Sequence, residues 1–285
     1  MNYIKTGLLL AVLTMLFVLV GGYFGGRTGA GYAFMFALIM NVGAYWFSDR
    51  IILSMYAAKE VNEAEVPELY NIVRGLIVSA VLPMPKLYIT QQNSPNAFAT
   101  GRDPKHAAVC VTQGILNILS RDELSGVIAH ELSHIKNRDT LIMTITATIA
   151  GAITMIANWA RWAAIFGGAG GRDRRDRDNN AIAYLFMLIV APIAAMLIQL
   201  AISRSREYAA DKRGAYIAGS PHGLADALLK LEKAAKVHPM HATSTSAHIF
   251  IVNPLSAEGL ASLFSTHPPV KDRVERLRKM EGRGR

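Results

Sequence analysis

The sequence has 285 residues, of which 52% are hydrophobic and only 18% are charged, a balance that is unusual for a soluble globular protein. The formal net charge is +9, but no nucleic-acid-binding motif accompanies the basic residues, so the charge does not indicate a nucleic-acid partner. The single cysteine, Cys110, cannot form an intramolecular disulfide, which fits a reduced compartment. We therefore expect part of the chain to lie in a membrane.

Two apolar runs occupy the N-terminal region. Residues 7–24 carry no charge, and a second run covers residues 31–48 after a short glycine-rich connector that contains Arg27. A lone run would fit a signal peptide, but the second run favours a membrane hairpin, because each is close to the roughly 20 residues that span a bilayer. We predict that residues 1–50 form an N-terminal membrane hairpin.

The composition changes past Arg50, and residues 51–140 are predicted to form the first part of a water-soluble domain. Residues 67–80 have the pattern of an amphipathic helix, which Pro83 and Pro85 end. Three extended segments follow, at residues 86–90, 96–101 and 107–112. We expect them to form a small sheet, whose exposed edge would be able to pair with a substrate backbone.

The most informative stretch is residues 120–140, which contains His130, Glu131 and His134 in the pattern His-Glu-x-x-His. A capping-box pattern at residues 120–123 and apolar residues at helical spacing predict a helix here. Two histidines four apart share one helix face, and the glutamate lies close enough to act on whatever they bind. The motif is short enough to arise by chance in roughly one chain in a hundred, so a metal site needs support from a third ligand.

Two further apolar runs, residues 141–160 and 181–202, flank a glycine-rich, mixed-charge stretch at residues 167–180 that we predict to be a mobile loop. Residues 141–202 would form a second membrane hairpin. Four spans would place the termini and the soluble segments on one side, with 24 of the 30 Lys and Arg residues. Because basic residues collect on the cytoplasmic side, we expect these parts to face the cytoplasm, although four arginines in the loop count against this. If the two runs only dip into the membrane, the loop would be cytoplasmic as well.

Residues 203–285 are predicted to form the C-terminal part of the soluble domain and to be mostly helical. Glu207 and Asp211 are four residues apart and so share a helix face. A catalytic zinc typically takes three protein ligands, and Glu207 is the candidate for the third; one of the two carboxylates would bind the metal while the other accepts a hydrogen bond from a ligand histidine. An ordinary exposed acidic pair beside Arg204 and Arg206 is the alternative.

The order of four motifs resembles the HtpX branch of the M48 zinc metalloproteases. These motifs are NAFATG at 96–101, HELSH at 130–134, SRSREYAAD at 203–211 and THPP at 266–269. The resemblance covers nearly the whole chain. It implies a mainly α integral membrane protein with four membrane helices and a zincin-like α+β domain of gluzincin type, in which a small sheet lies over the motif helix. It also implies location in the bacterial inner membrane and a stress-related role in the quality control of misfolded or damaged membrane proteins.

By this resemblance, His130, His134 and Glu207 bind one zinc ion, and Glu131 is the catalytic base in peptide hydrolysis by metal-activated water. Asp211 would orient a ligand histidine.

Other residues are expected to support the reaction. Asp139 would orient the second histidine or simply cap the helix, and His267 would stabilise the oxyanion or only end a helix before two prolines. The edge strand that holds an extended substrate would consist of Asn96, Ala97, Phe98 and Ala99, with Asn96 bonding a peptide carbonyl.

Two other functions compete with a zinc endopeptidase that acts on membrane-associated polypeptides. An intramembrane protease uses the same His-Glu-x-x-His motif, but here the metal residues flank the apolar runs instead of lying inside them. A non-enzymatic membrane chaperone or scaffold would carry a vestigial site, whereas every residue needed for hydrolysis is present. The sequence assigns no oligomeric state.

Overall fold

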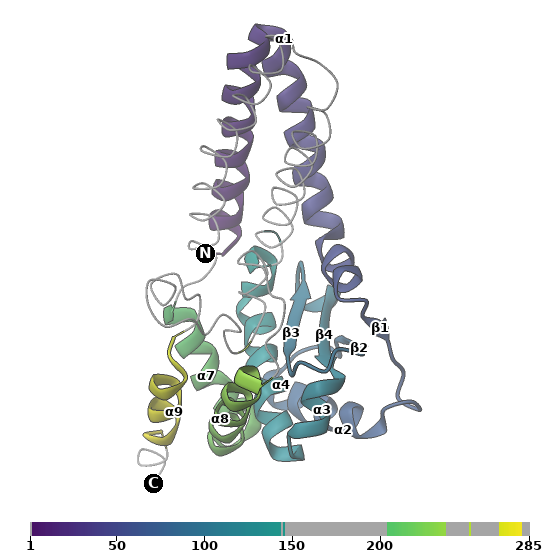
Figure 1. Ribbon diagram of the computed structural model, residues 1–285, viewed down its shortest axis with the longest axis vertical. Helices are drawn as coiled ribbons and strands as arrows, with labels where there is room; N and C mark the ends of the chain where they lie inside the picture. Colours follow the sequence, from purple (N-terminus) through teal and green to yellow (C-terminus); the bar gives the residue numbers. More distant parts are fainter. Residues whose placement is uncertain (1, 144, 146–203, 238–250, 252–267, 281–285) are drawn as a thin grey trace.

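The computed structural model describes residues 2–143, 145, 204–237, 251 and 268–280. In this part, a four-stranded sheet and several helices form one body, from which a long N-terminal helix projects (Figure 1). The predicted apolar run 181–202, most of the run 141–160, the loop 167–180 and His267 lie outside the described residues.

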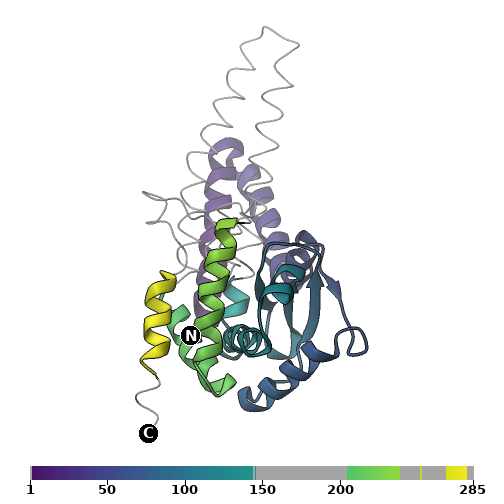
Figure 2. The same ribbon diagram turned by 60° about the horizontal axis from the view of Figure 1, so that its bottom comes forward.

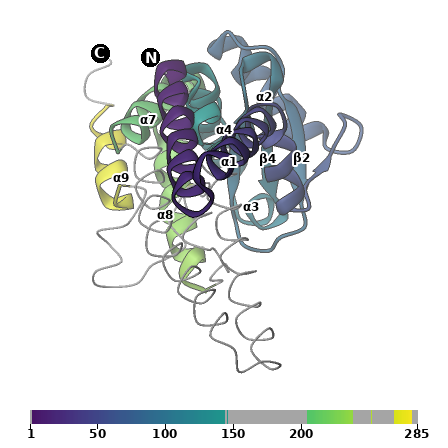
Figure 3. The same cartoon turned by 90° about the horizontal axis from the view of Figure 1, so that it is seen from above.

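The N-terminal helix α1 (Asn2–Met55) consists of two arms that meet at Gly26, whose φ of 57° and ψ of −146° are not helical. The arms lie side by side, since Asn41 Nδ2 donates a hydrogen bond of 2.8 Å to Thr14 Oγ1. Within the described residues, Gly25–Phe47 in the second arm is the one helix long and apolar enough to cross a membrane, and a shorter apolar helix lies in the first arm. Figure 3 looks down on the molecule from the α1 end.

The sheet has the strand order β1-β2-β4-β3. Its strands are β1 (Lys59–Glu60), β2 (Lys86–Thr90), β3 (Ala97–Gly101) and β4 (Ala107–Thr112). Strand β2 is parallel to β4, with Lys86 opposite Ala108, and β3 is antiparallel to β4, with Gly101 opposite Ala107. The three predicted extended segments are therefore strands, and β3 lies at an open edge of the sheet.

The helix that carries the motif lies at the centre of the body. It is α4 (Arg121–Asn137). The other helices of the body that the structure describes are α2 (Pro67–Ala80), α3 (Gln113–Ile118), α7 (Arg204–Ala218), α8 (His222–Val237) and α9 (Val270–Arg278), with a short 3-10 helix η1 (Pro104–His106). The predicted capping box is present at the start of α4, where Ser120 N donates to Glu123 Oε2 at 2.7 Å and the Ser120 side chain accepts from Glu123 N. The helix ends at Arg138, which has the left-handed conformation that is common after helix ends.

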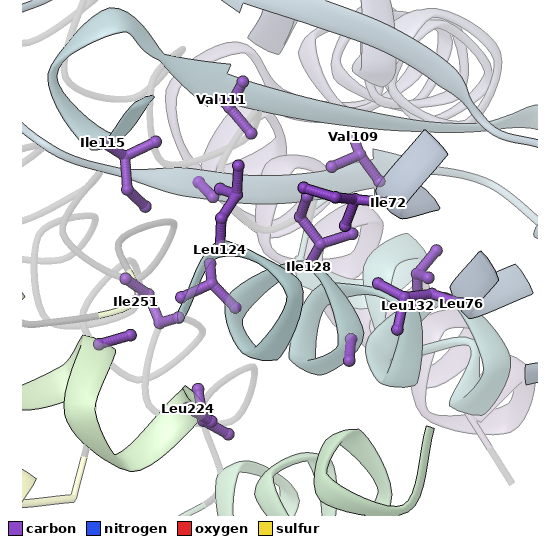
Figure 4. Packing of buried hydrophobic residues seen from close by; sticks show 14 of the residues in the cluster. Ile72, Leu76, Val109, Val111, Ile115, Leu124, Ile128, Leu132, Leu224 and Ile251 are labelled. Carbon is purple, nitrogen blue, oxygen red and sulfur yellow. The ribbon is translucent and has the colours of Figure 1, made fainter. Parts of the chain in front are cut away.

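Helix α4 is buried from several sides. Ile128 and Leu132 face α2 and β4, and Leu224 of α8 packs among the same buried residues (Figure 4). Helices α7 and α8 lie beside α4, and α9 packs against both (Figure 2). The motif helix is therefore held on nearly all sides, which keeps its side chains in fixed positions.

The end of α1 covers the other face of the sheet. A separate apolar cluster joins Ile52 and Leu53 of α1, and Tyr56 just after it, to Phe98, Ala108 and Cys110 of the strands. Because strand side chains alternate between faces, these strand residues point away from α4. The sheet thus connects the membrane-type helix to the motif helix.

Candidate metal centre

Three buried side chains meet between α4 and α7. His130 Nε2 lies 3.2 Å from His134 Nε2, and the Glu207 carboxylate oxygens lie 3.7 Å from each of these two nitrogens. Zinc bonds of about 2.0–2.1 Å in a tetrahedron place neighbouring ligand atoms about 3.3 Å apart. The three side chains are therefore spaced as ligands of one ion.

The opposite ring nitrogens of both histidines face carboxylates. His130 Nδ1 lies 2.9 Å from Asp211 Oδ1, and His134 Nδ1 lies 3.3 Å from Asp139 Oδ2. With Nδ1–H donating to a carboxylate, each Nε2 presents a lone pair. Two lone pairs and a carboxylate directed at one buried point repel each other unless a cation lies among them, and two imidazoles with one carboxylate form a donor set that Zn²⁺ favours.

The local electrostatics also favour a positive charge at this point. Burial alone lowers the pKa of His134, but Asp139, Glu207 and Glu131 raise it to about 9. The surrounding carboxylates thus stabilise a cation at the position that the three candidate ligands share.

A glycine lets α7 approach α4 closely enough to form this centre. A Cβ added at Gly214 would lie 3.0 Å from the backbone N and Cα of His130. Glu207, Asp211 and Gly214 follow one another at helical spacing, and all three are buried. The alternative of an exposed acidic pair is therefore wrong, because both carboxylates lie against α4.

Arg273 of α9 completes the contacts of Asp211, and the sequence analysis missed it. Its Nε and Nη2 donate to the two Asp211 oxygens at 2.8 and 2.6 Å, and Nη1 donates to the Ile251 carbonyl at 2.8 Å. Burial raises the pKa of Asp211, but Arg273 and His130 outweigh it and bring that pKa to about 2. Asp211 is therefore an ionised acceptor.

A signal for Arg273 was present in the sequence. Arg273 lies on the same helix face as Val270, Val274 and Leu277, and all four residues are buried. An arginine within an apolar helix face is rarely buried without a partner, so it would have predicted a buried carboxylate opposite α9.

Glu131 lies between the metal residues and the sheet. Its Oε2 accepts a hydrogen bond of 2.9 Å from the backbone N–H of Ala99 in β3. Burial raises the pKa of Glu131, and this effect outweighs the opposing influence of His130 and His134. A carboxylate with a raised pKa is suited to accept a proton and return it near neutral pH.

The open edge of β3 faces this centre. The Asn96 carbonyl accepts from Thr112 N of β4, so the main-chain groups of alternate residues, Ala97 and Ala99, point away from β4. The Phe98 side chain is buried beneath Tyr56, which directly follows α1, with ring centroids 5.1 Å apart. Among the described residues, strand β3 therefore pairs with another strand on one side only.

The Asn96 side chain is buried. Its Oδ1 accepts a hydrogen bond from Ile251 N at 3.3 Å. Among the described residues, no acceptor lies within hydrogen-bonding distance of its Nδ2. A buried amide donor without a partner costs free energy, so this group is suited to bind a ligand carbonyl.

The structure brings together all the candidate site residues that lie in its described part. They are His130, Glu131, His134, Asp139, Glu207 and Asp211, together with strand β3, whose Ala99 contacts Glu131. The Phe98 side chain of the same strand lies on the opposite face of the sheet. Two other histidines of the described residues, His106 and His222, are exposed.

Comparison with known proteins gives a consistent picture. Residues 63–281 match the model of Peptidase family M48. A "Protease HtpX homolog" of Syntrophotalea carbinolica is 56% identical over 281 residues, 98% of this chain and 99% of that protein. A second "Protease HtpX homolog", from Thermodesulfovibrio yellowstonii, is 57% identical over 283 residues, which are 99% of this chain and 100% of that protein.

A solved structure shares the fold at low identity. The crystal structure of S. mikatae Ste24p superposes with a TM-score of 0.54 at 17% identity. The match covers 94% of this chain but spans only 62% of the Ste24p chain.

Proposed function

The chain belongs to peptidase family M48, and we propose that it is a zinc-dependent endopeptidase whose ion is held by His130, His134 and Glu207. It is a membrane metalloprotease. The observation that carries the proposal is the convergence of two Nε2 atoms and one carboxylate on a buried point beside Glu131. This arrangement provides the three ligands and the base that metal-assisted hydrolysis needs.

Zinc bound there would polarise the scissile carbonyl and activate water. Glu131 takes the proton of the attacking water and passes it to the departing amine. The Ala99 N–H holds one Glu131 oxygen in place, which fixes the direction in which the carboxylate receives the proton. Asp211 and Asp139 keep the Nδ1 protons of the two histidines, so that both Nε2 atoms remain available as ligands.

The open edge of β3 would bind the substrate as an additional strand. The main-chain groups of Ala97 and the carbonyl of Ala99 are directed to that edge, and pairing through the backbone tolerates many sequences. The Asn96 Nδ2 would donate to a substrate carbonyl, which satisfies a donor that is buried in the protein. The sheet edge thus aligns an extended polypeptide with the metal centre.

We place the enzyme in the bacterial inner membrane with the metal centre on the cytoplasmic side. The helix Gly25–Phe47 supports the membrane location, and the distribution of Lys and Arg supports the orientation. Several relatives carry the name "Protease HtpX homolog". We propose misfolded or damaged membrane proteins as substrates, because α4 leads directly into an apolar run and holds the metal ligands next to it.

Removal and return of zinc test this function. The purified full chain in detergent is incubated with an unfolded, fluorescently labelled casein, treated with a chelator, and then supplied with zinc. We expect cleavage to stop with the chelator and to return with about one equivalent of zinc. Cleavage that persists after complete removal of metal would contradict the proposal. Cleavage confined to a membrane-spanning peptide would favour an intramembrane protease instead.

A further inference from the structure

We propose that the end of α2 and the turn that follows it dock into the membrane surface, as a second membrane contact beside α1. We call this segment the apolar turn, and its members are Val78, Val81, Leu82, Pro83 and Met84. The proposal depends on the membrane location of α1 and not on the hydrolytic activity. Its partner is the interface between lipid headgroups and acyl chains.

The apolar turn exposes large hydrophobic side chains at neighbouring positions. The exposed fractions are 75% for Val78, 81% for Val81 and 38% for Met84. Val81 also has a left-handed backbone, with φ of 54° and ψ of 56°. Glycine or asparagine would fit this helix end with less strain than a β-branched residue. Val81 is thus an apolar residue at a position that is exposed to solvent and has a strained backbone conformation. This combination suggests that its side chain has a function.

The strand register places this turn at a defined end of the sheet. The turn directly precedes Lys86, the first residue of β2, and Lys86 lies opposite Ala108 of β4. Gly101, the last residue of β3, lies opposite Ala107. The start of β2 and the end of β3 therefore lie at the same height, within about one residue rise of 3.3 Å.

This end of the sheet touches the end of the membrane-type helix. The Arg102 guanidinium lies 4.8 Å from the centre of the Trp46 ring, and Trp46 precedes the last residue of the candidate span. Tryptophan is enriched at membrane–water interfaces, and basic side chains accompany it there. The contact places the β3–β4 connection, and with it the apolar turn, near the level of the membrane surface.

A second contact independently gives the same placement. Lys136, in the last turn of α4, donates its Nζ hydrogen bond to the carbonyl of Ala80 at 2.5 Å. Residues 139–143, which follow α4, are helical and open the third apolar run. The end of α4 and the tip of β3 are directed to the side from which α1 projects (Figure 1). The apolar turn therefore lies beside a point where the chain is expected to meet the bilayer.

Two membrane contacts would fix the orientation of the metal centre. The α1 arms alone would leave the body free to tilt, whereas a further contact across the sheet restricts that motion. Because β3 lies between α1 and the catalytic Glu131, its open edge would be held at one angle to the membrane. Polypeptides that emerge from the bilayer would then reach the edge strand in one direction.

Fluorescence quenching by lipids tests this docking. The full chain is reconstituted in vesicles of phosphatidylcholine and phosphatidylglycerol, with an environment-sensitive fluorophore on Val81→Cys. The native Cys110 is buried, and the unsubstituted chain serves as the labelling blank. Ile39→Cys, 66% exposed within the span, is the membrane reference. Ile118→Cys, 37% exposed in α3 after the far end of β4, is the aqueous reference.

We expect spin-labelled lipids with quenchers near the headgroups to quench the Val81 label strongly and the Ile118 label weakly. Equal quenching of the Val81 and Ile118 labels would overturn the proposal. Energy transfer between labelled copies at Val81, without quenching by lipids, would assign the turn to a protein contact and would overturn it as well.

A variant that preserves the backbone separates docking from folding. Asparagine tolerates the left-handed conformation, so Val78→Asn combined with Val81→Asn should leave the thermal unfolding temperature unchanged or raise it. A label on Met84→Cys should then lose most of its quenching by lipids in this background. Unchanged quenching of the Met84 label would mean that the valines do not hold the turn in the membrane, and the proposal would fail.

Discussion

His130 Nδ1 lies 2.9 Å from Asp211 Oδ1, and this contact determines which ring nitrogen of the histidine is free. Asp211 is ionised, because Arg273 outweighs the effect of burial and brings its pKa to about 2. An ionised carboxylate accepts the Nδ1 proton, and the Nε2 lone pair is then directed at His134 and Glu207. The chain of contacts from α9 through α7 to α4 therefore leaves His130 Nε2 available for the metal that we propose.

Replacement of Arg273 should weaken both folding and metal binding. Arg273→Met leaves the buried Asp211 carboxylate without its partner, which we expect to cost about 3–5 kcal/mol of unfolding free energy. Zinc affinity should fall about 10- to 100-fold, because His130 loses its fixed orientation. Thermal unfolding and zinc titration check this. Arg276→Met on the same helix, where Arg276 stacks on Tyr208, is the matched control and should change both much less. Similar effects of the two variants would contradict the role given to Arg273.

The sequence analysis gives Asp139 two alternative roles, either to orient His134 or only to cap the helix. Asp139→Ala removes the carboxylate 3.3 Å from His134 Nδ1, and we expect zinc affinity to fall about 10- to 100-fold. Asp139→Asn retains an oxygen acceptor of the same size and should recover part of this loss. A stability loss with unchanged zinc affinity would show that Asp139 only caps the helix.

Asn96 should act on substrate binding and not on the metal. Asn96→Asp keeps the oxygen that accepts from Ile251 N but replaces the Nδ2 donor with an acceptor. Loss of one hydrogen bond to a substrate carbonyl should raise KM about tenfold or more, with the zinc content unchanged. Steady-state kinetics on an extended peptide and metal analysis provide the test. An unchanged KM would remove Asn96 from the substrate site.

Cys110 should resist thiol reagents over a wide pH range. Burial raises its pKa to about 12, against about 8.5 in an unfolded chain, so at pH 8 the folded protein contains roughly a thousandfold less thiolate. The folded state favours the neutral thiol, so this group's contribution to stability is complete below about pH 8.5 and is lost as the pH rises towards 12. We expect labelling by iodoacetamide to be slow at pH 8 and to become fast on denaturation. Rapid labelling of the folded chain would show that the cluster of α1 with the sheet opens readily.

Local patterns predicted the parts of the site that lie within one element. The spacing of His130 and His134 gave their shared helix face, and the capping box gave the start of α4. The extended segments became strands, with the segment after Asn96 at the edge. Each of these features depends on residues that are near in sequence, where helical and strand periodicity apply.

Contacts between distant segments could not be read in the same way. Asp211 pairs with His130, but the sequence does not fix which ligand histidine it supports, because this depends on how α7 crosses α4 at Gly214. The identity of the carboxylate that pairs with Arg273 likewise depends on where α9 packs. The apolar residues on the same helix face indicate only that the Arg273 charge is buried.

Zinc content and peptide hydrolysis, measured together on the purified full chain, test the central claim most directly. Glu131→Gln should retain about one zinc per chain but lose hydrolysis at least 100-fold, because only the base is removed. Glu207→Ala should lose both zinc and hydrolysis. Asp122→Asn, an exposed acid in the first turn of α4, is the control and should match the wild type in both measurements. Wild-type hydrolysis by Glu131→Gln, or a full zinc content in Glu207→Ala, would contradict the account.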